Sequence, residues 1–267
     1  MNKKVIITIN ITFAACLAAF LIISLLYTQK RWKSVLCTKL EVNIIDSAEN
    51  QFVKKEDVAA ILRSSGQAYF GKKIVEISAS EMEKVLHSKS LIKKAEVYTS
   101  IDGTLHVSIL QRKPIARVYA SNGRNFYVDY DGYILQPYNA YTSYVPIVNG
   151  SIKSIFPNGY KGNMFEYMGK NKINDSSFVK LYFFLKYISD RDFWKAQIEQ
   201  IYFTSEATIE FIPRVGAQII RMGSVNNFEY KLRKLLTVYE KGLPISGWNT
   251  YDVIDLSYSN QVVCKKR

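Results

Sequence analysis

A long run of uncharged, mostly apolar residues close to the N-terminus determines where this chain can reside. Residues 5–27 read VIITINITFAACLAAFLIISLLY and contain no charged side chain. A helix of this length crosses the hydrocarbon core of a bilayer, which is about 30 Å thick. The sequence therefore predicts a short tail at 1–4, a transmembrane helix at 5–27 and a juxtamembrane linker at 28–38.

A cleaved signal is the main alternative for this segment. A secretory signal peptide has a shorter apolar core that ends at a small-residue cleavage site. Here apolar residues continue past every pair of small residues. The segment FAAC at 13–16 resembles a lipoprotein signal, but Cys16 is followed by further apolar residues where a polar tether is expected. Length therefore favours a helix that stays in the membrane.

The charges beside this run leave its orientation open. Lys3 and Lys4 precede it, whereas Lys30, Arg31 and Lys33 follow it. By a count of nearby bases, the larger C-terminal part is cytoplasmic, with a margin of a single charge. Long domains are often translocated regardless of such charges.

Residues 39–112 have the pattern of a small α+β domain. An alternating strand comes first, and two helical patterns follow, the first of which ends at Gly66. Two further strand patterns meet at a turn formed by Asp102 and Gly103, which predicts a hairpin. The expected order is β-α-α-β-β.

Residues 113–264 predict a mostly antiparallel β domain with two packed helices. A hairpin turn is expected within 129–132, and three strands are expected over 198–224. A segment rich in proline and glycine, 136–174, reads as a loop. The last three residues, 265–267, form a basic tail.

The two helices of this domain have recognisable ends. Asp175 is the expected N-cap of the first. The second begins with Asn226 and Glu229 as a capping box, and Gly242 with Pro244 is expected to end it. The basic side chains of the second helix are expected to face solvent: Lys231, Arg233 and Lys234.

The closing residues, 251–267, read YDVIDLSYSNQVVCKKR and predict one continuous strand at a sheet edge. One polar residue, Asn260, interrupts an otherwise apolar row on one face of that strand. The row consists of Ile254, Leu256, Tyr258, Val262 and Cys264. Because the strand is expected to stop in three bases, with no further strand to cover it, the edge either is blunted by those charges or stays open to a partner.

The sequence contains no motif for catalysis or for cofactor binding. The segment DYDG at 129–132 lacks the glycine and glutamate that a calcium loop needs at its sixth and twelfth positions. The two histidines, His87 and His106, have no nucleophile motif, and the three cysteines lack zinc spacing. The net charge of +13 includes no basic run with interleaved aromatics, which disfavours nucleic-acid binding. We expect no cofactor, no metal and no small-molecule substrate.

Two groups of residues, taken in order, carry a family resemblance. The first is QRKPIA at 111–116 followed by the hairpin at 127–132. The second is the strand GAQIIRMGS at 216–224, a helix, and a closing strand, with these residues: Lys231, Leu232, Leu235, Asp255, Leu256, Ser257 and Tyr258. The arrangement resembles the FtsQ family of bacterial cell-division proteins, also called DivIB, and the segment at 39–112 looks like the POTRA domain of that family.

The resemblance implies an α+β protein with a single transmembrane helix, a POTRA-like domain and a β domain. It implies type II topology in the inner membrane, with the domains on the outer, periplasmic side at the division septum. The protein would be a non-catalytic divisome scaffold. It would bind small division proteins of the FtsB and FtsL type and link them to septal peptidoglycan synthesis.

In that family the last strand accepts a strand from the partner. The resemblance therefore assigns partner contacts to one row of the closing strand: Leu256, Tyr258, Asn260 and Val262.

Two other functions remain as alternatives. A membrane-anchored envelope enzyme acting on peptidoglycan or other glycans would need two close carboxylates with perturbed pKa values in a cleft of residues 111–267. A secretion or assembly component would normally carry further POTRA modules or a membrane barrel.

Overall fold

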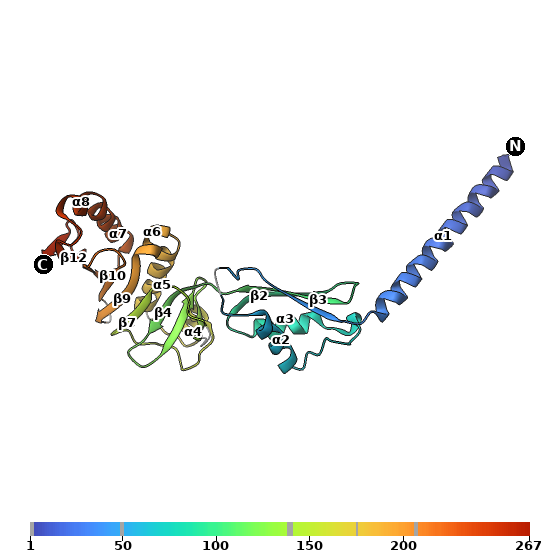
Figure 1. The fold of residues 1–267 in the computed structure, drawn as a ribbon, viewed down its shortest axis with the longest axis horizontal. Coiled ribbons are helices and arrows are strands. Elements are labelled where there is room, and N and C mark those ends of the chain that lie inside the picture. Colours follow the sequence, from blue (N-terminus) through green and yellow to red (C-terminus); the bar gives the residue numbers. More distant parts are fainter. Residues whose placement is uncertain (1–2, 49–50, 138–140, 175, 206–207) are drawn as a thin grey trace. The chain divides into compact units, whose positions relative to one another are not determined.

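The computed structural model describes residues 3–48, 51–137, 141–174, 176–205 and 208–267. The chain divides into two compact units. One contains residues 1–47 and 53–111, and the other contains 48–52 and 112–267. Figure 1 follows the elements along the chain from the N-terminal helix to the last strands. Each unit is described separately.

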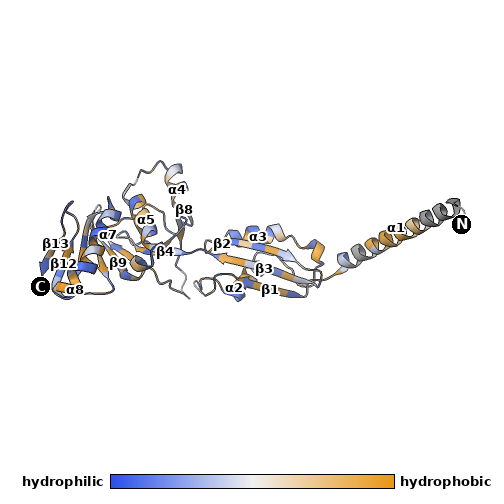
Figure 2. Cartoon of the chain, turned by 90° about the horizontal axis from the view of Figure 1, so that it is seen from above, coloured by the Kyte–Doolittle hydropathy of each residue, from blue (hydrophilic) through white to orange (hydrophobic). Residues whose placement is uncertain are grey.

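The N-terminal helix α1 spans Lys3–Ser34. Its stretch Thr12–Ser34 is long and apolar enough to cross a membrane. The described side chains at 12–27 are exposed, as expected for a helix that lipid surrounds, and Figure 2 shows the hydrophobic band. The helix continues beyond residue 27, so it takes up part of the segment expected to be a linker.

The rest of the first unit confirms the predicted β-α-α-β-β order. Its elements are β1 (Lys39–Ile44), α2 (Lys55–Ser64), the short 3₁₀ helix η1 (Ile74–Glu76), α3 (Ala79–His87), β2 (Ile92–Thr99) and β3 (Thr104–Gln111). The sheet order is β1-β3-β2, with β1 parallel and β2 antiparallel to β3. The helices bury Leu62 and Leu86, and the sheet buries Val107. This amphipathic packing explains why the sequence periodicity is so clear.

Two glycines act as the sequence predicts. Gly66 has a φ of +76°, and its N–H bonds to the Arg63 carbonyl at 3.2 Å, which ends α2. Gly103 has a φ of +85° in the turn between β2 and β3. A side chain there would also collide with the carbonyl of Leu36, so this turn lies directly against the segment that follows α1.

The second unit contains one large sheet whose strand order is β13-β12-β11-β10-β9-β7-β4-β5-β6-β8. The strands are β4 (Pro114–Tyr119), β5 (Asn125–Asp129), β6 (Tyr133–Leu135), β7 (Ile147–Gly150), β8 (Gly162–Asn163), β9 (Ile198–Ser205), β10 (Thr208–Pro213), β11 (Ile219–Ser224), β12 (Tyr251–Asp255) and β13 (Val263–Lys266). The pairs β4–β7, β7–β9 and β11–β12 are parallel, and the other pairs are antiparallel. The mostly antiparallel β domain is therefore confirmed.

Helices also contribute to the hydrophobic core of the second unit. They are α4 (Met164–Lys170), α5 (Ser176–Ser189), α6 (Asp192–Gln197), α7 (Phe228–Thr237) and α8 (Leu243–Ser246). The two predicted helices are α5 and α7, which bury Leu185 and Leu232 in the same cluster as Phe203 of β9. On the opposite side of the strands, Tyr202 and Ile212 are exposed.

One expectation about this domain is wrong, and another lies outside the described residues. The segment 136–174 includes β7, β8 and α4, so it is not a simple loop. The pairing of β7 between β4 and β9 is long-range, and local proline and glycine content does not report it. The predicted cap Asp175 lies outside the residues that the structure describes.

Both predicted ends of α7 are wrong. Its N-cap is Asn227 at a φ of +54°, with no side-chain capping bond, so Asn226 and Glu229 form no capping box. At the other end the chain continues through a π turn, Val238–Gly242, into α8. Pro244 lies in the first turn of α8, where its missing N–H is tolerated, and Leu243 is buried. The helical conformation therefore continues past Gly242 and Pro244, the residues expected to end it, because Leu243 packs in the core.

Candidate functional site

The predicted continuous strand over 251–267 is wrong, because the chain folds back on itself there. β12 ends at Asp255, and β13 returns antiparallel to it, with Val263 opposite Asp255. The Asp255 carboxylate accepts a hydrogen bond from the Ser257 N–H at 2.9 Å, a local bond that favours a turn. Leu256 is fully buried, and its N–H bonds to the Arg221 carbonyl at 2.8 Å. The turn therefore begins where the sequence pattern suggested more strand.

A lysine of α7 holds this turn. The Lys234 ammonium donates to the backbone carbonyls of Leu256 at 3.3 Å and Gln261 at 3.2 Å, and it also reaches those of Tyr258 and Ser259. Lys234 thus joins the two arms of the turn between β12 and β13.

A second lysine of α7 acts on the neighbouring strand. Lys231 donates to the carbonyls of Met222 and Ser224, at 3.0 and 2.7 Å. Desolvation lowers the pKa of both lysines, Lys231 and Lys234. The expectation that they face solvent is therefore wrong, whereas Arg233 is exposed as predicted.

Replacing Lys234 with methionine tests its role in the turn. The variant keeps an unbranched apolar stem but leaves the turn carbonyls without their charged donor. We expect the folded state to lose about 1.5–3 kcal/mol of stability, the range for hydrogen bonds to charged groups. Hydrogen exchange should accelerate at 257–266. Arg233→Met on the same helix is the matched control. Equal hydrogen-exchange rates at 257–266 in the two variants would contradict the proposed role of Lys234 in the turn.

The outer side of β13 carries backbone donors that point away from the sheet. The Arg267 N–H bonds back to the Thr250 carbonyl at 3.2 Å. Successive N–H groups alternate between the two sides of a strand, so those of Val263 and Lys265 also face β12. The N–H groups of Cys264 and Lys266 therefore face outward. Among the described residues, no strand pairs with that side of β13.

The structure places the four predicted contact residues in or beside the turn, not along one strand. Leu256 is buried, whereas Tyr258 is 50% exposed and Asn260 is exposed. Val262 is partly buried and packs against the core. Sequence reasoning missed β13 as a separate edge strand. The alternation in VVCKK after a possible Asp-x-Ser turn is the signal that would have found it.

A row of charges supports the sheet next to this edge. Arg221 on β11 forms an ion pair with Glu210 on β10, with Nε and Oε1 2.9 Å apart. Its Nη1 lies 3.6 Å from Asp255 on β12. The hydrogen bond to Glu210, more than any other contact, raises the pKa of Arg221. These contacts cross-link three consecutive strands beside β13.

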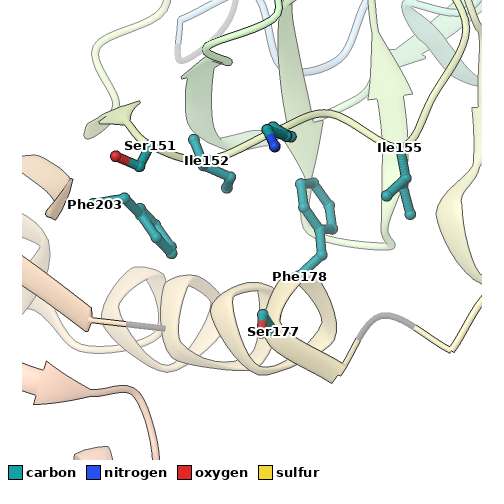
Figure 3. Close-up of a pocket in the computed structure, with 7 residues that line it drawn as sticks. Ser151, Ile152, Ile155, Ser177, Phe178 and Phe203 are labelled. Atoms are coloured by element: carbon teal, nitrogen blue, oxygen red, sulfur yellow. The ribbon is translucent and has the colours of Figure 1, made fainter. Parts of the chain in front are cut away.

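Two cavities formed by described residues of the β domain lack the groups that the enzyme alternative needs. The cavity in Figure 3 has a volume of about 170 Å³, and Ile152, Phe178 and Phe203 contribute apolar walls. No carboxylate occurs among the described residues that line it. A second cavity, of about 390 Å³, includes Glu199, which forms an ion pair with Arg214 at 2.9 Å. Neither provides the carboxylate pair that the enzyme alternative needs.

The buried carboxylate of Asp129 has a structural role. It accepts hydrogen bonds from the N–H groups of Asp131 and Tyr133, at 2.9 and 2.6 Å, and forms an ion pair with Arg112 at 3.0 Å. Burial raises the pKa of Asp129, and the Tyr133 N–H and Arg112 oppose that effect. These bonds form the predicted hairpin turn at 129–132. Among the described residues, no cluster of His, Cys, Asp or Glu could hold a metal ion.

One serine–histidine contact occurs in the first unit. Ser100 Oγ lies 3.1 Å from His106 Nε2, and Glu41 lies 3.8 Å from the other ring nitrogen. However, the Ser100 hydroxyl is also within bonding distance of the Asp102 carboxylate and the Thr104 carbonyl. Both are acceptors for its proton, so the contact stabilises the β2–β3 turn and does not present an activated nucleophile.

An apolar helix long enough to span a bilayer is followed by a β-α-α-β-β domain and by a sheet that, among the described residues, ends at β13. This order defines a class: single-pass membrane proteins with a POTRA-like domain. A family model described as a POTRA-like domain matches residues 35–110. A model described as FtsQ/DivIB, C-terminal related, matches residues 113–265, more than half of the chain. The chain therefore belongs to the FtsQ/DivIB family and is a membrane-anchored protein of cell division. No curated protein matches it.

Proposed function

We propose that this chain is a non-catalytic divisome scaffold that binds small bitopic division proteins of the FtsB and FtsL type. The binding surface is the free edge of β13, and the bound proteins connect the chain to septal peptidoglycan synthesis. The outward N–H groups of Cys264 and Lys266 carry this proposal. An unpaired edge strand is a template for strand addition.

The residues around the edge support a specific fit. Backbone bonds to β13 supply affinity, while the neighbouring side chains set the register of the added strand. Tyr258 and Asn260 are available for this purpose because they are exposed on the turn, and Val262 lies where the turn meets β13. Leu256 contributes by anchoring the turn, since its side chain is buried.

Charge narrows the class of partner strand. Lys265, Lys266 and Arg267 are exposed at the edge. Such a cluster favours a strand with acidic side chains and opposes pairing with a second copy of the same basic strand.

We further propose that the chain has type II topology, with both units on the outer face of the inner membrane at the division septum. Family membership supports this orientation, because the partners named above would have to reach β13 on that side. The charge count beside α1 favours the opposite orientation by one charge, a margin that a long translocated domain overrides.

The test replaces one outward donor. Lys266→Pro removes an outward N–H while leaving the N–H groups that face β12, and proline is tolerated on edge strands. Lys266→Ala removes the same charge but keeps the N–H. We expect the proline variant to bind an FtsB/FtsL-type complex about tenfold more weakly than the alanine variant, from one lost bond and the bulk of the ring. Equal affinities in a direct binding assay would refute pairing at this edge.

A further inference from the structure

Two loops of the first unit expose large apolar side chains at the end where α1 joins it. Phe70 lies in the loop between α2 and η1, and Ile101 lies in the β2–β3 turn. Their exposed fractions are 73% and 77%. Val75 and Leu36 are also exposed beside these loops. We call these four residues, Leu36, Phe70, Val75 and Ile101, the apolar tip.

Hydrogen bonds tie the apolar tip to the chain that leaves α1. The N–H of Ile74 bonds to the Val35 carbonyl at 3.0 Å, and the N–H of Cys37 bonds to the Lys72 carbonyl at 2.8 Å. The N–H of Thr38 bonds to the Gly103 carbonyl at 2.9 Å, which fixes the β2–β3 turn to the same segment. Both loops are therefore held against residues 35–38.

This attachment limits how far the apolar tip can lie from the membrane. The apolar run of α1 ends at Tyr27, the helix continues to Ser34, about 10 Å further along its axis, and two residues of extended chain add at most about 7 Å. Leu36 therefore lies at most about 17 Å beyond the end of the apolar run, close to the membrane surface. The loops bonded to residues 35–38 are held at a similar distance from the membrane.

The charges around the apolar tip suit an anionic surface. Lys33, Lys72 and Lys73 are exposed there, and Lys30 and Arg31 precede them in the sequence. Two acids lie nearby, Glu76 and Asp102, and these five bases outnumber them. Glu76 forms an ion pair with Lys73 at 3.5 Å, and Asp102 accepts hydrogen bonds from the N–H and hydroxyl of Thr104, both at 3.1 Å.

We propose that the apolar tip inserts into the interfacial layer of an anionic bilayer and so docks the POTRA-like domain onto the membrane that α1 crosses. Apolar side chains rimmed by lysines are typical of surfaces that bind in this layer. The proposal rests on membrane anchoring by α1 and is independent of partner binding at β13.

The test places a fluorophore on the apolar tip of the full chain. Phe70→Cys and Ile101→Cys are made separately in a chain whose native cysteines are alanine, and each is labelled with an environment-sensitive dye. The labelled chain is reconstituted in vesicles of phosphatidylcholine and phosphatidylglycerol that contain spin-labelled lipid. We expect both dyes to shift to the blue and to lose most of their fluorescence to the lipid quencher.

A matched control comes from the other end of the same sheet. Ile45 is 62% exposed and follows β1, a strand length away from Ile101. The dye at Ile45→Cys should not be quenched by lipid. Absence of quenching at both positions of the apolar tip, or equal quenching at Ile45, would overturn the proposal. Because the vesicles contain this chain alone, neither result depends on division partners.

Discussion

A chain that ends at Ser257 is expected to lose capture of its FtsB/FtsL-type partner, with affinity at least about 100-fold lower, equivalent to about 2.7 kcal/mol. The truncation removes β13 and with it the outward N–H groups of Cys264 and Lys266. Each backbone hydrogen bond contributes roughly 1 kcal/mol net, so losing several accounts for the expected change. The measurement is a pull-down that compares the full-length chain with the chain ending at Ser257, both reconstituted in membranes.

The control for this truncation separates charge from pairing. A chain with Lys265→Ala and Lys266→Ala keeps the β13 backbone, so it should retain most of its binding. The truncated chain should still fold, because its buried core lies before the cut and includes Ile254 and Leu256. Retained or tighter binding by a folded chain ending at Ser257 would show that the partner pairs with β12 and that β13 has to leave first.

Replacing Asp129 with alanine is expected to cause the largest loss of stability, about 3–5 kcal/mol, typical of breaking a buried ion pair by removing one partner. The variant leaves the guanidinium of Arg112 without its carboxylate and the N–H groups of Asp131 and Tyr133 without their acceptor. Asp129 is only 1% exposed, so water cannot readily take over these bonds.

Denaturant unfolding of the second unit measures this loss. Asp129→Asn serves as the control, since its amide oxygen can still accept the turn N–H groups while the charge is gone. It should fall between wild type and Asp129→Ala. A loss below about 1 kcal/mol in the alanine variant would contradict the structural role given to this carboxylate.

The local architecture could be predicted where the signal itself is local. The turns at Gly103 and Gly132 have positive φ and lie at the predicted hairpins. The stripe of α7 that contains Leu232 and Leu235 is buried as its helical spacing requires. In these cases periodicity and backbone conformation follow from neighbouring residues alone.

Long-range contacts could not be predicted in the same way. Lys234 resembles a surface lysine in the sequence, and only the fold brings it to the carbonyls between β12 and β13. Leu256 continues an alternating pattern, yet its burial and the bond from Ser257 to Asp255 turn the chain. The edge strand was therefore expected in the right region, but its identity and direction depended on tertiary packing.

Amide hydrogen exchange across β13, measured with and without the bound partner, tests strand addition most directly. The outward N–H groups of Cys264 and Lys266 should exchange at least about tenfold more slowly in the complex, because a new bond protects each of them. Those of Val263 and Lys265, which already face β12, should change little. Unchanged exchange at Cys264 and Lys266 in a saturated complex would contradict binding at this edge.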